Sequence, residues 1–249
     1  PHAVSAMIVM SHREESPVPP SKRRQAIKYN VYRVMPEWRR LPDAERDAAK
    51  EQFTAVVEET ASTMRIKSYS LVGMRSDADL MLWCVGRSLE DHQRFSELLN
   101  RTALASYLET PYSYLAMTRK SQYVGNHRHT GQEGTSEGFK PGNSKYFVLY
   151  PFTKTRQWYM LPQEERQRMM SVHFTVGHKF PSVKINTSYS FGLDDQEFMV
   201  GFETDVPSDF LALVMELRGS EASSYTLLDT PIFTGIHRPI EETLASLGD

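Results

Sequence analysis

The amino-acid sequence predicts an α+β fold made of two similar halves, and an internal repeat is the first observation that predicts it. Three landmarks recur in the same order 120 residues further along the chain. They are Leu41-Pro42 with Leu161-Pro162, Ser68-Tyr69-Ser70 with Ser188-Tyr189-Ser190, and Thr110-Pro111 with Thr230-Pro231. Landmarks that recur in one order and at one spacing indicate a duplicated unit.

The order of elements in the second half is the second observation. A β-rich run (145–152) precedes a helix (162–180), two strands (183–192 and 195–204), a helix (208–225) and a short closing strand (230–236). The first helix begins with a proline and then acidic residues, which suits a helix N-terminus. Ser208 is a candidate N-cap for the second helix.

This order, strand-helix-strand-strand-helix-strand, is the ferredoxin-like pattern. We therefore expect two tandem ferredoxin-like halves, residues 26–120 and 146–249, whose sheets pack together or close into a barrel with helices outside. Residues 1–25 are rich in proline, serine and charge, which predicts a flexible N-terminal tail. Residues 121–145 are rich in glycine, serine and asparagine, which predicts a long connecting loop.

Composition narrows the class of protein. The net charge of −2 and the absence of a basic excess argue against a nucleic-acid partner. The single cysteine, Cys84, excludes an intramolecular disulfide framework and fits a reducing compartment. No apolar run approaches the roughly 20 residues that a membrane-spanning helix needs. We expect a cytoplasmic protein without a membrane span.

His173 is the first candidate functional residue. Met169, His173, Val176 and Phe180 form one stripe of the helix, so the histidine stands where an apolar residue is expected. At the offset of 120 residues its counterpart is Phe53. One reading is a buried histidine that is hydrogen-bonded within the core. The other is a ligand, and a single axial histidine in an apolar pocket is what haem iron accepts, whereas zinc needs more ligands.

The segment YPFTKTRQWY, residues 150–159, holds the next candidates. Tyr150 ends a strand, Lys154 follows four residues later, and Trp158 precedes the helix. They can form an ordinary strand edge with aromatic packing and a solvated lysine. Alternatively, they combine an oxidisable phenol, a cation that can pair with a carboxylate, and an indole beside a ring cofactor.

Other candidates have weaker patterns. The strand 183–191 alternates, so Ile185 and Asn186 point to opposite faces. Arg218 and Ser223 on the last predicted helix can bind an anion or lie on a charged surface. His127 and His129 in the long loop are expected to be exposed to solvent.

Together these residues resemble the chlorite dismutase superfamily, most closely its coproheme decarboxylase branch. The resemblance extends from about residue 25 to the end of the chain. Its most specific parts are YPFTKTRQWYMLPQEER, the following SVHF, and then YSFGLDD and TPIFTG. It implies a dimeric α+β barrel within one chain and a homopentamer, with porphyrin bound by residues 146–249 and none by residues 26–120.

The resemblance also implies an activity. The expected reaction is the conversion of iron coproporphyrin III, which is both substrate and cofactor, to haem b. Hydrogen peroxide drives the oxidative decarboxylation of two propionates. His173 matches the iron ligand, Tyr150 the tyrosine that becomes a radical, Lys154 the lysine beside it, and Trp158 the pocket tryptophan.

The distal side departs from true chlorite dismutases, which place an arginine above the iron. Counting from the two ends of the strand gives Ile185 or Asn186 at that position, so oxygen production from chlorite is disfavoured. His127 and His129 are the nearest candidates for a base that acts on peroxide.

Four residues are candidate propionate contacts: Arg218, Ser223, Tyr112 and Tyr114. The alternatives to a decarboxylase are a haem peroxidase or chlorite-converting enzyme of the same superfamily, or a non-catalytic haem-binding or haem-transfer protein.

Overall fold

The computed structural model of the chain describes residues 24–123 and 139–248. The expected N-terminal tail lies almost entirely outside these residues, and so do His127 and His129. The described parts of the expected connecting loop contain no helix or strand. Within the described residues, no helix is long and apolar enough to cross a membrane.

The two halves contain corresponding elements at nearly constant spacing. The first half consists of β1 (Ala26–Val34), η1 (Pro36–Arg40), α1 (Asp43–Ala61), β2 (Arg65–Ser70), β3 (Leu80–Gly86), α2 (Leu89–Leu99), η2 (Leu104–Tyr107) and β4 (Leu108–Met117). The second half consists of β5 (Tyr146–Lys154), α3 (Arg156–Met160), α4 (Gln163–Gly177), β6 (Val183–Tyr189), β7 (Phe198–Thr204), α5 (Pro207–Arg218), η4 (Glu221–Tyr225), β8 (Thr226–Leu228) and β9 (Phe233–His237). A last helix, α6 (Ile240–Ala245), follows. β1 and β5 begin and end 120 residues apart, as the sequence repeat predicts.

The strands form one large antiparallel sheet that closes on itself. The first half contributes the neighbours β4-β1-β3-β2, and the second contributes β9-β5-β7-β6. The halves are joined by β2 with β9, through the pairs Tyr69–His237 and Ser70–Ile236. On the other side, β4 meets β6 at the pair Met117–Tyr189. With the β5–β7 pairing these contacts complete a ring of strands, and β8 pairs with β5 beside it.

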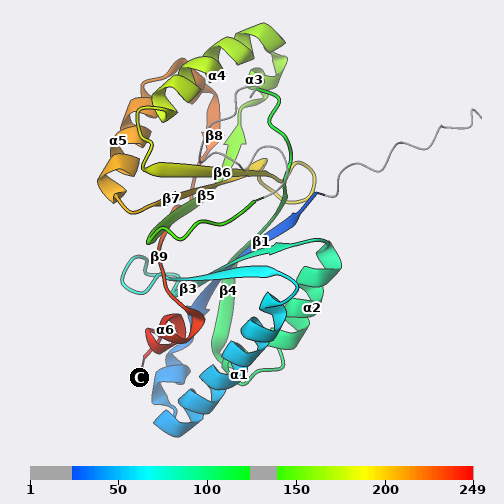
Figure 1. Ribbon diagram of the computed structural model, residues 1–249, viewed down its shortest axis with the longest axis vertical. Helices are drawn as coiled ribbons and strands as arrows, with labels where there is room; N and C mark the ends of the chain where they lie inside the picture. Colours follow the sequence, from blue (N-terminus) through cyan, green and yellow to red (C-terminus); the bar gives the residue numbers. More distant parts are fainter. Residues whose placement is uncertain (1–23, 124–138, 249) are drawn as a thin grey trace, which may run out of the picture.

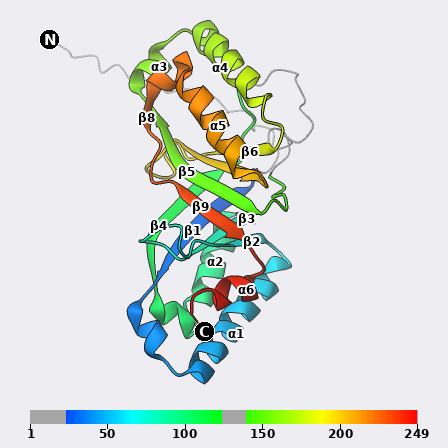
Figure 2. The same cartoon turned by 90° about the vertical axis from the view of Figure 1, so that its left-hand side faces the viewer.

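The helices cover the outside of this ring on two sides. In Figure 1 the strands occupy the middle of the molecule, with α4 and α5 at one end and α1 and α2 at the other. Figure 2 shows that α6, the last element of the chain, lies beside α1 of the first half. Its residues Ile240 and Leu244, and Leu247 after it, share an apolar core with Trp38 and Phe53.

Aromatic side chains fill the inside of the closed ring of strands. The rings of Trp83 and Phe147 stack with centroids 4.7 Å apart, and Tyr69 stacks on Phe147 at 4.9 Å. Gly201 leaves room for Phe147, because a Cβ there would lie 2.7 Å from the ring. Phe139, which is only 1% exposed, packs edge-on against Trp83. These contacts bury large apolar surfaces from both halves in one core.

Several element boundaries differ from those expected from the sequence. Helix α5 begins at Pro207, so Ser208 lies in its first turn and the predicted N-cap role is wrong. Proline at the first helical position is favoured because its φ angle is already helical. The same predicted helix ends at Arg218, and Ser223 lies in the separate 3-10 turn η4. The short strand β8 has no counterpart in the predicted pattern.

Candidate functional site

The first half serves as an internal reference for the second half, because the offset of 120 residues pairs structurally equivalent positions. Asn30 on β1 corresponds to Tyr150 on β5, and Val34 corresponds to Lys154. The second half therefore carries a phenol and an amine where the first carries an amide and an apolar side chain. In α4, His173 likewise replaces a phenylalanine.

Tyr150 lies on the side of β5 that α4 and α5 cover. It packs against an apolar cluster between sheet and helices, the helix-side cluster, which consists of Val148, Val176, Val183, Phe202 and Leu213. Its ring stacks on Phe202 with centroids 5.7 Å apart. Burial, and then the negative charge of Asp229, hold the pKa of the Tyr150 phenol well above its usual range. The phenol is therefore protonated at neutral pH.

Lys154 lies four residues further along β5 and is only 9% exposed. Its ammonium group donates a hydrogen bond of 2.6 Å to the carbonyl oxygen of Ala222 and lies 4.6 Å from the ring centroid of Trp158. Burial lowers the pKa of Lys154 to about 8, although the charge of Glu197 opposes this shift. An amine with such a pKa can give up or take up a proton near neutral pH.

His173 lies on α4 between the buried residues Met169 and Val176. Burial lowers the pKa of its imidazole to about 4, and the positive charge of Lys154 adds to this effect. The ring is therefore neutral at pH 7, as metal coordination requires. Among residues 24–123 and 139–248, neither ring nitrogen has a hydrogen-bond partner. Neither nitrogen is among the buried, unpartnered polar atoms of the described residues, so the imidazole is open to a ligand.

Trp158 has a close equivalent in the first half. Trp158 packs against Tyr225 with ring centroids 5.6 Å apart and an interplanar angle of 56°. Trp38 packs against Tyr107 at 5.9 Å and 54°. Both indoles are buried. The tryptophan-tyrosine pair thus belongs to the packing of both halves, and Trp158 borders the candidate site as part of that packing.

The structure separates the two candidates for the distal position. Ile185 packs against the helix-side cluster, on the same side of the sheet as Tyr150. Asn186 points to the inside of the ring of strands, where it is 1% exposed and its Nδ2 donates to Glu203 Oε1 at 2.9 Å. Ile185 therefore lies on the side of the candidate site, and Asn186 does not.

Of the four candidate propionate contacts, two lie near Tyr150 and Lys154 and two lie elsewhere. Arg218 ends α5 and forms an ion pair with Asp229, the residue whose charge acts on Tyr150. Ser223 directly follows Ala222, which accepts the Lys154 hydrogen bond.

The other two candidates, Tyr112 and Tyr114, pack against the core inside the ring of strands. The hydroxyl of Tyr112 donates to Asp77 at 2.7 Å. The structure does not bring these two tyrosines to the face that α4 and α5 cover.

One residue of this region, Glu197, was not singled out from the sequence. Glu197, 8% exposed, accepts hydrogen bonds at Oε2 from the Tyr159 hydroxyl at 2.5 Å and from the backbone N–H of Lys154 at 2.9 Å. The first half has an equivalent of the bond to the Lys154 backbone, since Asp79 Oδ2 accepts from the backbone N–H of Val34 at 2.8 Å. A comparison of the two halves at an offset of 118 residues, Asp79 with Glu197, could have found this carboxylate.

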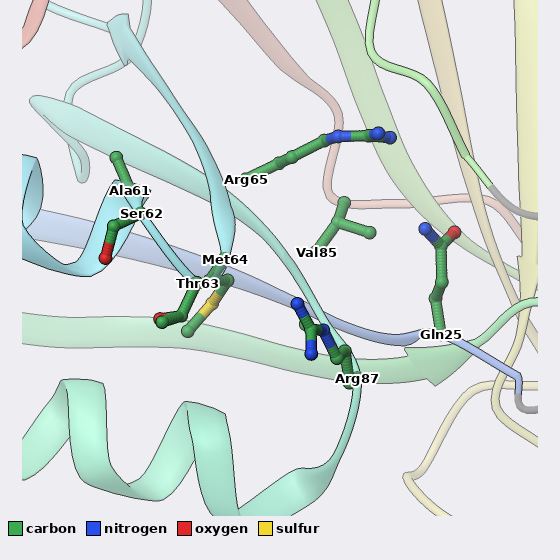
Figure 3. A pocket seen from close by; sticks show the side chains of 9 residues that line it. Gln25, Ala61, Ser62, Thr63, Met64, Arg65, Val85 and Arg87 are labelled. Carbon is green, nitrogen blue, oxygen red and sulfur yellow. The ribbon is translucent and has the colours of Figure 1, made fainter.

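A polar cavity of about 290 Å³ lies in the first half, and Figure 3 shows its lining. It is bordered by Gln25, by residues 61–65 and by residues 85–87. The Arg65 guanidinium already donates to the carbonyl oxygen of Phe139 at 2.9 Å. None of the candidate site residues lines this cavity.

Comparisons with known proteins show the family to which the chain is related. A model of the Chlorite dismutase family matches residues 46–238. A coproheme decarboxylase from Mycolicibacterium smegmatis (strain ATCC 700084 / mc(2)155) is 30% identical over 223 residues, which cover 89% of this chain and 93% of the relative.

Solved structures give the same result. A mutant chlorite dismutase from Candidatus Nitrospira defluvii has a TM-score of 0.80 at 25% identity and covers 88% of this chain and 94% of its own. A haem-binding protein from Thermus thermophilus has a TM-score of 0.78 at 26% identity, with coverages of 90% and 94%. The family model spans both halves, from α1 to the end of β9, and this chain therefore belongs to the chlorite dismutase family.

Proposed function

We propose that this protein is a coproheme decarboxylase, which converts iron coproporphyrin III to haem b with hydrogen peroxide as the oxidant. The observation that carries the proposal is the neutral imidazole of His173, which has no hydrogen-bond partner among the described residues. It lies in the half of the chain where Tyr150 and Lys154 replace Asn30 and Val34. The relative from Mycolicibacterium smegmatis supports this activity, since it is named as a coproheme decarboxylase.

The residues present suit an iron porphyrin. His173 would supply a nitrogen ligand for the iron, and the helix-side cluster would supply an apolar wall for the macrocycle. Lys154 and Arg218 are cations that can pair with propionates. The ion pair of Arg218 with Asp229 would have to open or be shared when a propionate binds. Ile185 adds apolar surface and no charge on this side of the sheet.

In the proposed reaction each propionate becomes a vinyl group. It loses carbon dioxide, one proton and two electrons, and one hydrogen peroxide takes up two electrons and two protons to become two waters. Bound iron porphyrin supplies the oxidising power of peroxide. Tyr150 would give up an electron and its phenolic proton and then take a hydrogen atom from the propionate side chain. Lys154, with a pKa of about 8, can hold the carboxylate and move a proton.

For the fold and assembly, we propose that each half is a ferredoxin-like unit, as the strand orders β4-β1-β3-β2 and β9-β5-β7-β6 support. We further propose a homopentamer in the cytoplasm, with porphyrin in the second half only. In the first half, the space under α1 is filled by Phe53 and by residues of α6.

The test is mass spectrometry of the porphyrin extracted after incubation with iron coproporphyrin III and titrated hydrogen peroxide. Stepwise loss of two units, each of carbon dioxide plus two hydrogen atoms, is expected. The Tyr150→Phe variant should bind the porphyrin and leave its mass unchanged, whereas Tyr146→Phe on the same strand should react normally. Recovery of intact or bleached porphyrin from the wild-type protein would contradict the proposal.

The second candidate is a haem protein without decarboxylation, and the likeness to the haem-binding protein from Thermus thermophilus favours it. It predicts tight porphyrin binding with no peroxide-driven change of mass. A chlorite-converting enzyme is a third candidate, which the similarity to chlorite dismutase structures favours and the apolar Ile185 opposes. Rapid oxygen release from chlorite would identify it.

A further inference from the structure

A carboxylate holds the end of the same strand in both halves, half-buried in the first half and buried in the second. Asp79 binds the backbone N–H of Val34 at the end of β1, and Glu197 binds that of Lys154 at the end of β5. Because this bond occurs in both halves, it is part of the fold. It does not explain the second hydrogen bond that Glu197 accepts and that Asp79 does not.

The additional contact in the second half is a phenol. Tyr159 stands where the first half has Arg39. Its hydroxyl donates to Glu197 Oε2, the same oxygen that accepts from the backbone N–H of Lys154. Burial, followed by this hydrogen bond, raises the pKa of the Tyr159 phenol far above its usual range. The guanidinium of Arg156 lies 4.0 Å from the other oxygen of Glu197. The phenol therefore has a carboxylate base within hydrogen-bond distance.

Tyr159 is also close to the proposed reaction centre. It directly follows Trp158, whose ring lies 4.6 Å from the ammonium group of Lys154. Its own ring packs edge-on against Phe191 at 6.0 Å. Two oxidisable side chains, Trp158 and Tyr159, thus adjoin the lysine of the site.

We propose that Tyr159 is a second oxidisable tyrosine of this site and that Glu197 takes up its proton. This inference rests on the proposed function for its oxidant, hydrogen peroxide acting at the bound porphyrin. Tyr159 loses one electron to that site, and its O–H proton moves along the hydrogen bond to Glu197 Oε2. The products are a neutral tyrosyl radical and a protonated Glu197. Reduction of one peroxide to two waters takes two electrons and two protons; Tyr159 supplies one of the electrons, and the bound porphyrin would supply the other.

The physical reason is that an oxidised phenol is a strong acid, so its oxidation is easier when a base can accept the proton at once. A charge-assisted bond to a buried carboxylate provides this acceptor without movement of the side chain. Tyr150 has no carboxylate hydrogen-bonded to it within the described residues. Oxidation of Tyr159 therefore keeps an oxidising equivalent in the protein when Tyr150 has no propionate to react with.

The test uses iron coproporphyrin III and hydrogen peroxide with the Tyr150→Phe variant, in which the phenol of the proposed reaction is absent. Electron paramagnetic resonance of freeze-quenched samples should still show a tyrosyl radical. Adding Tyr159→Phe should remove that signal, and adding Glu197→Gln should reduce it at least several-fold. The glutamine keeps an oxygen that can accept both hydrogen bonds but cannot take a proton.

Asp79→Asn is the matched control, since it makes the same change to the equivalent strand bond where no tyrosine is present. It should leave the radical signal unchanged. A signal that persists in the Tyr150→Phe/Tyr159→Phe protein, or one that Asp79→Asn and Glu197→Gln reduce equally, would overturn the proposal.

A second readout needs no porphyrin. In the porphyrin-free protein, alkaline difference spectra of wild type against Tyr159→Phe report the ionisation of this one phenol. Glu197→Gln should lower the pH at which Tyr159 ionises, because the negative charge beside it is removed. An unchanged titration would show that the pair does not exist in solution and would sink the inference. Failure of decarboxylation with a Tyr159 radical still present would instead count against the proposed function alone.

Discussion

Trp38 and Trp158 occupy the same position in the two halves of the chain, each in a short helix that follows the first strand of its half and each packed against a tyrosine. Residues that both halves share serve the fold, which both halves need. Residues that only the second half carries, such as His173 and Lys154, are then the candidates for chemistry. The repeat thus separates packing from function within one molecule.

This separation predicts the effect of removing the tryptophans. Trp38→Ala and Trp158→Ala should each lower the free energy of unfolding of the porphyrin-free protein by about 3–5 kcal/mol, the usual cost of emptying a buried aromatic site. Denaturant titrations of both variants measure this directly. If Trp158→Ala cost almost nothing while Trp38→Ala cost the full amount, Trp158 would be kept for the porphyrin and not for packing.

The imidazole of His173 is expected to bind the iron of an added porphyrin. His173→Ala should shift the absorption spectrum of the ferric complex, because the axial nitrogen is lost. His178→Ala, just beyond the end of the same helix and exposed, is the control and should leave the spectrum unchanged. Identical spectra for wild type and His173→Ala would show that this histidine does not bind the iron and serves packing instead.

The same histidine makes stability depend on pH before any porphyrin binds. Its pKa is about 4 in the folded protein and about 6.5 in the unfolded chain, so the unfolded chain binds more protons between these values. The free energy of unfolding should therefore fall as the pH drops from about 6.5 to 4, with roughly 2–3 kcal/mol arising from His173.

His173→Phe, which copies Phe53, tests this dependence. The variant should lose that part of the pH dependence, whereas the contribution of His92, whose pKa is also lowered by burial, remains in both proteins. Denaturant titrations at several pH values measure the difference. Parallel stability curves for wild type and variant would contradict the burial of a neutral imidazole.

The opposite faces of β6 give a paired prediction for Ile185 and Asn186. Asn186→Arg overfills the inside of the ring of strands and should cost about 1–3 kcal/mol of stability. Ile185→Arg places a guanidinium on the side of Tyr150 and should be tolerated better. Oxygen release from chlorite should rise over wild type only in Ile185→Arg. A larger loss of stability in Ile185→Arg than in Asn186→Arg would show that the faces are assigned wrongly.

The repeat and the alternation of apolar residues were enough to predict the order of the main elements. The repeat also singled out His173, whereas Tyr150 and Lys154 became candidates through the residue types in the segment 150–159 and through the family resemblance. Alternation also predicted that Ile185 and Asn186 face apart. It could not say which face α4 and α5 cover, because that depends on packing between distant parts of the chain. Glu197 was missed for a similar reason, since its partners Lys154 and Tyr159 lie about 40 residues away.

Strand β9 and helix α6 give the fold a consequence for how the protein is made. β9 lies between β2 of the first half and β5 of the second, and α6 completes the apolar core around Trp38. On the ribosome the first half emerges early, yet its core remains open until α6 has also emerged. A premature stop before Ile240 would therefore leave the core of the first half incomplete. For the same reason, the two halves cannot be expressed as separate proteins unless new surfaces replace these contacts.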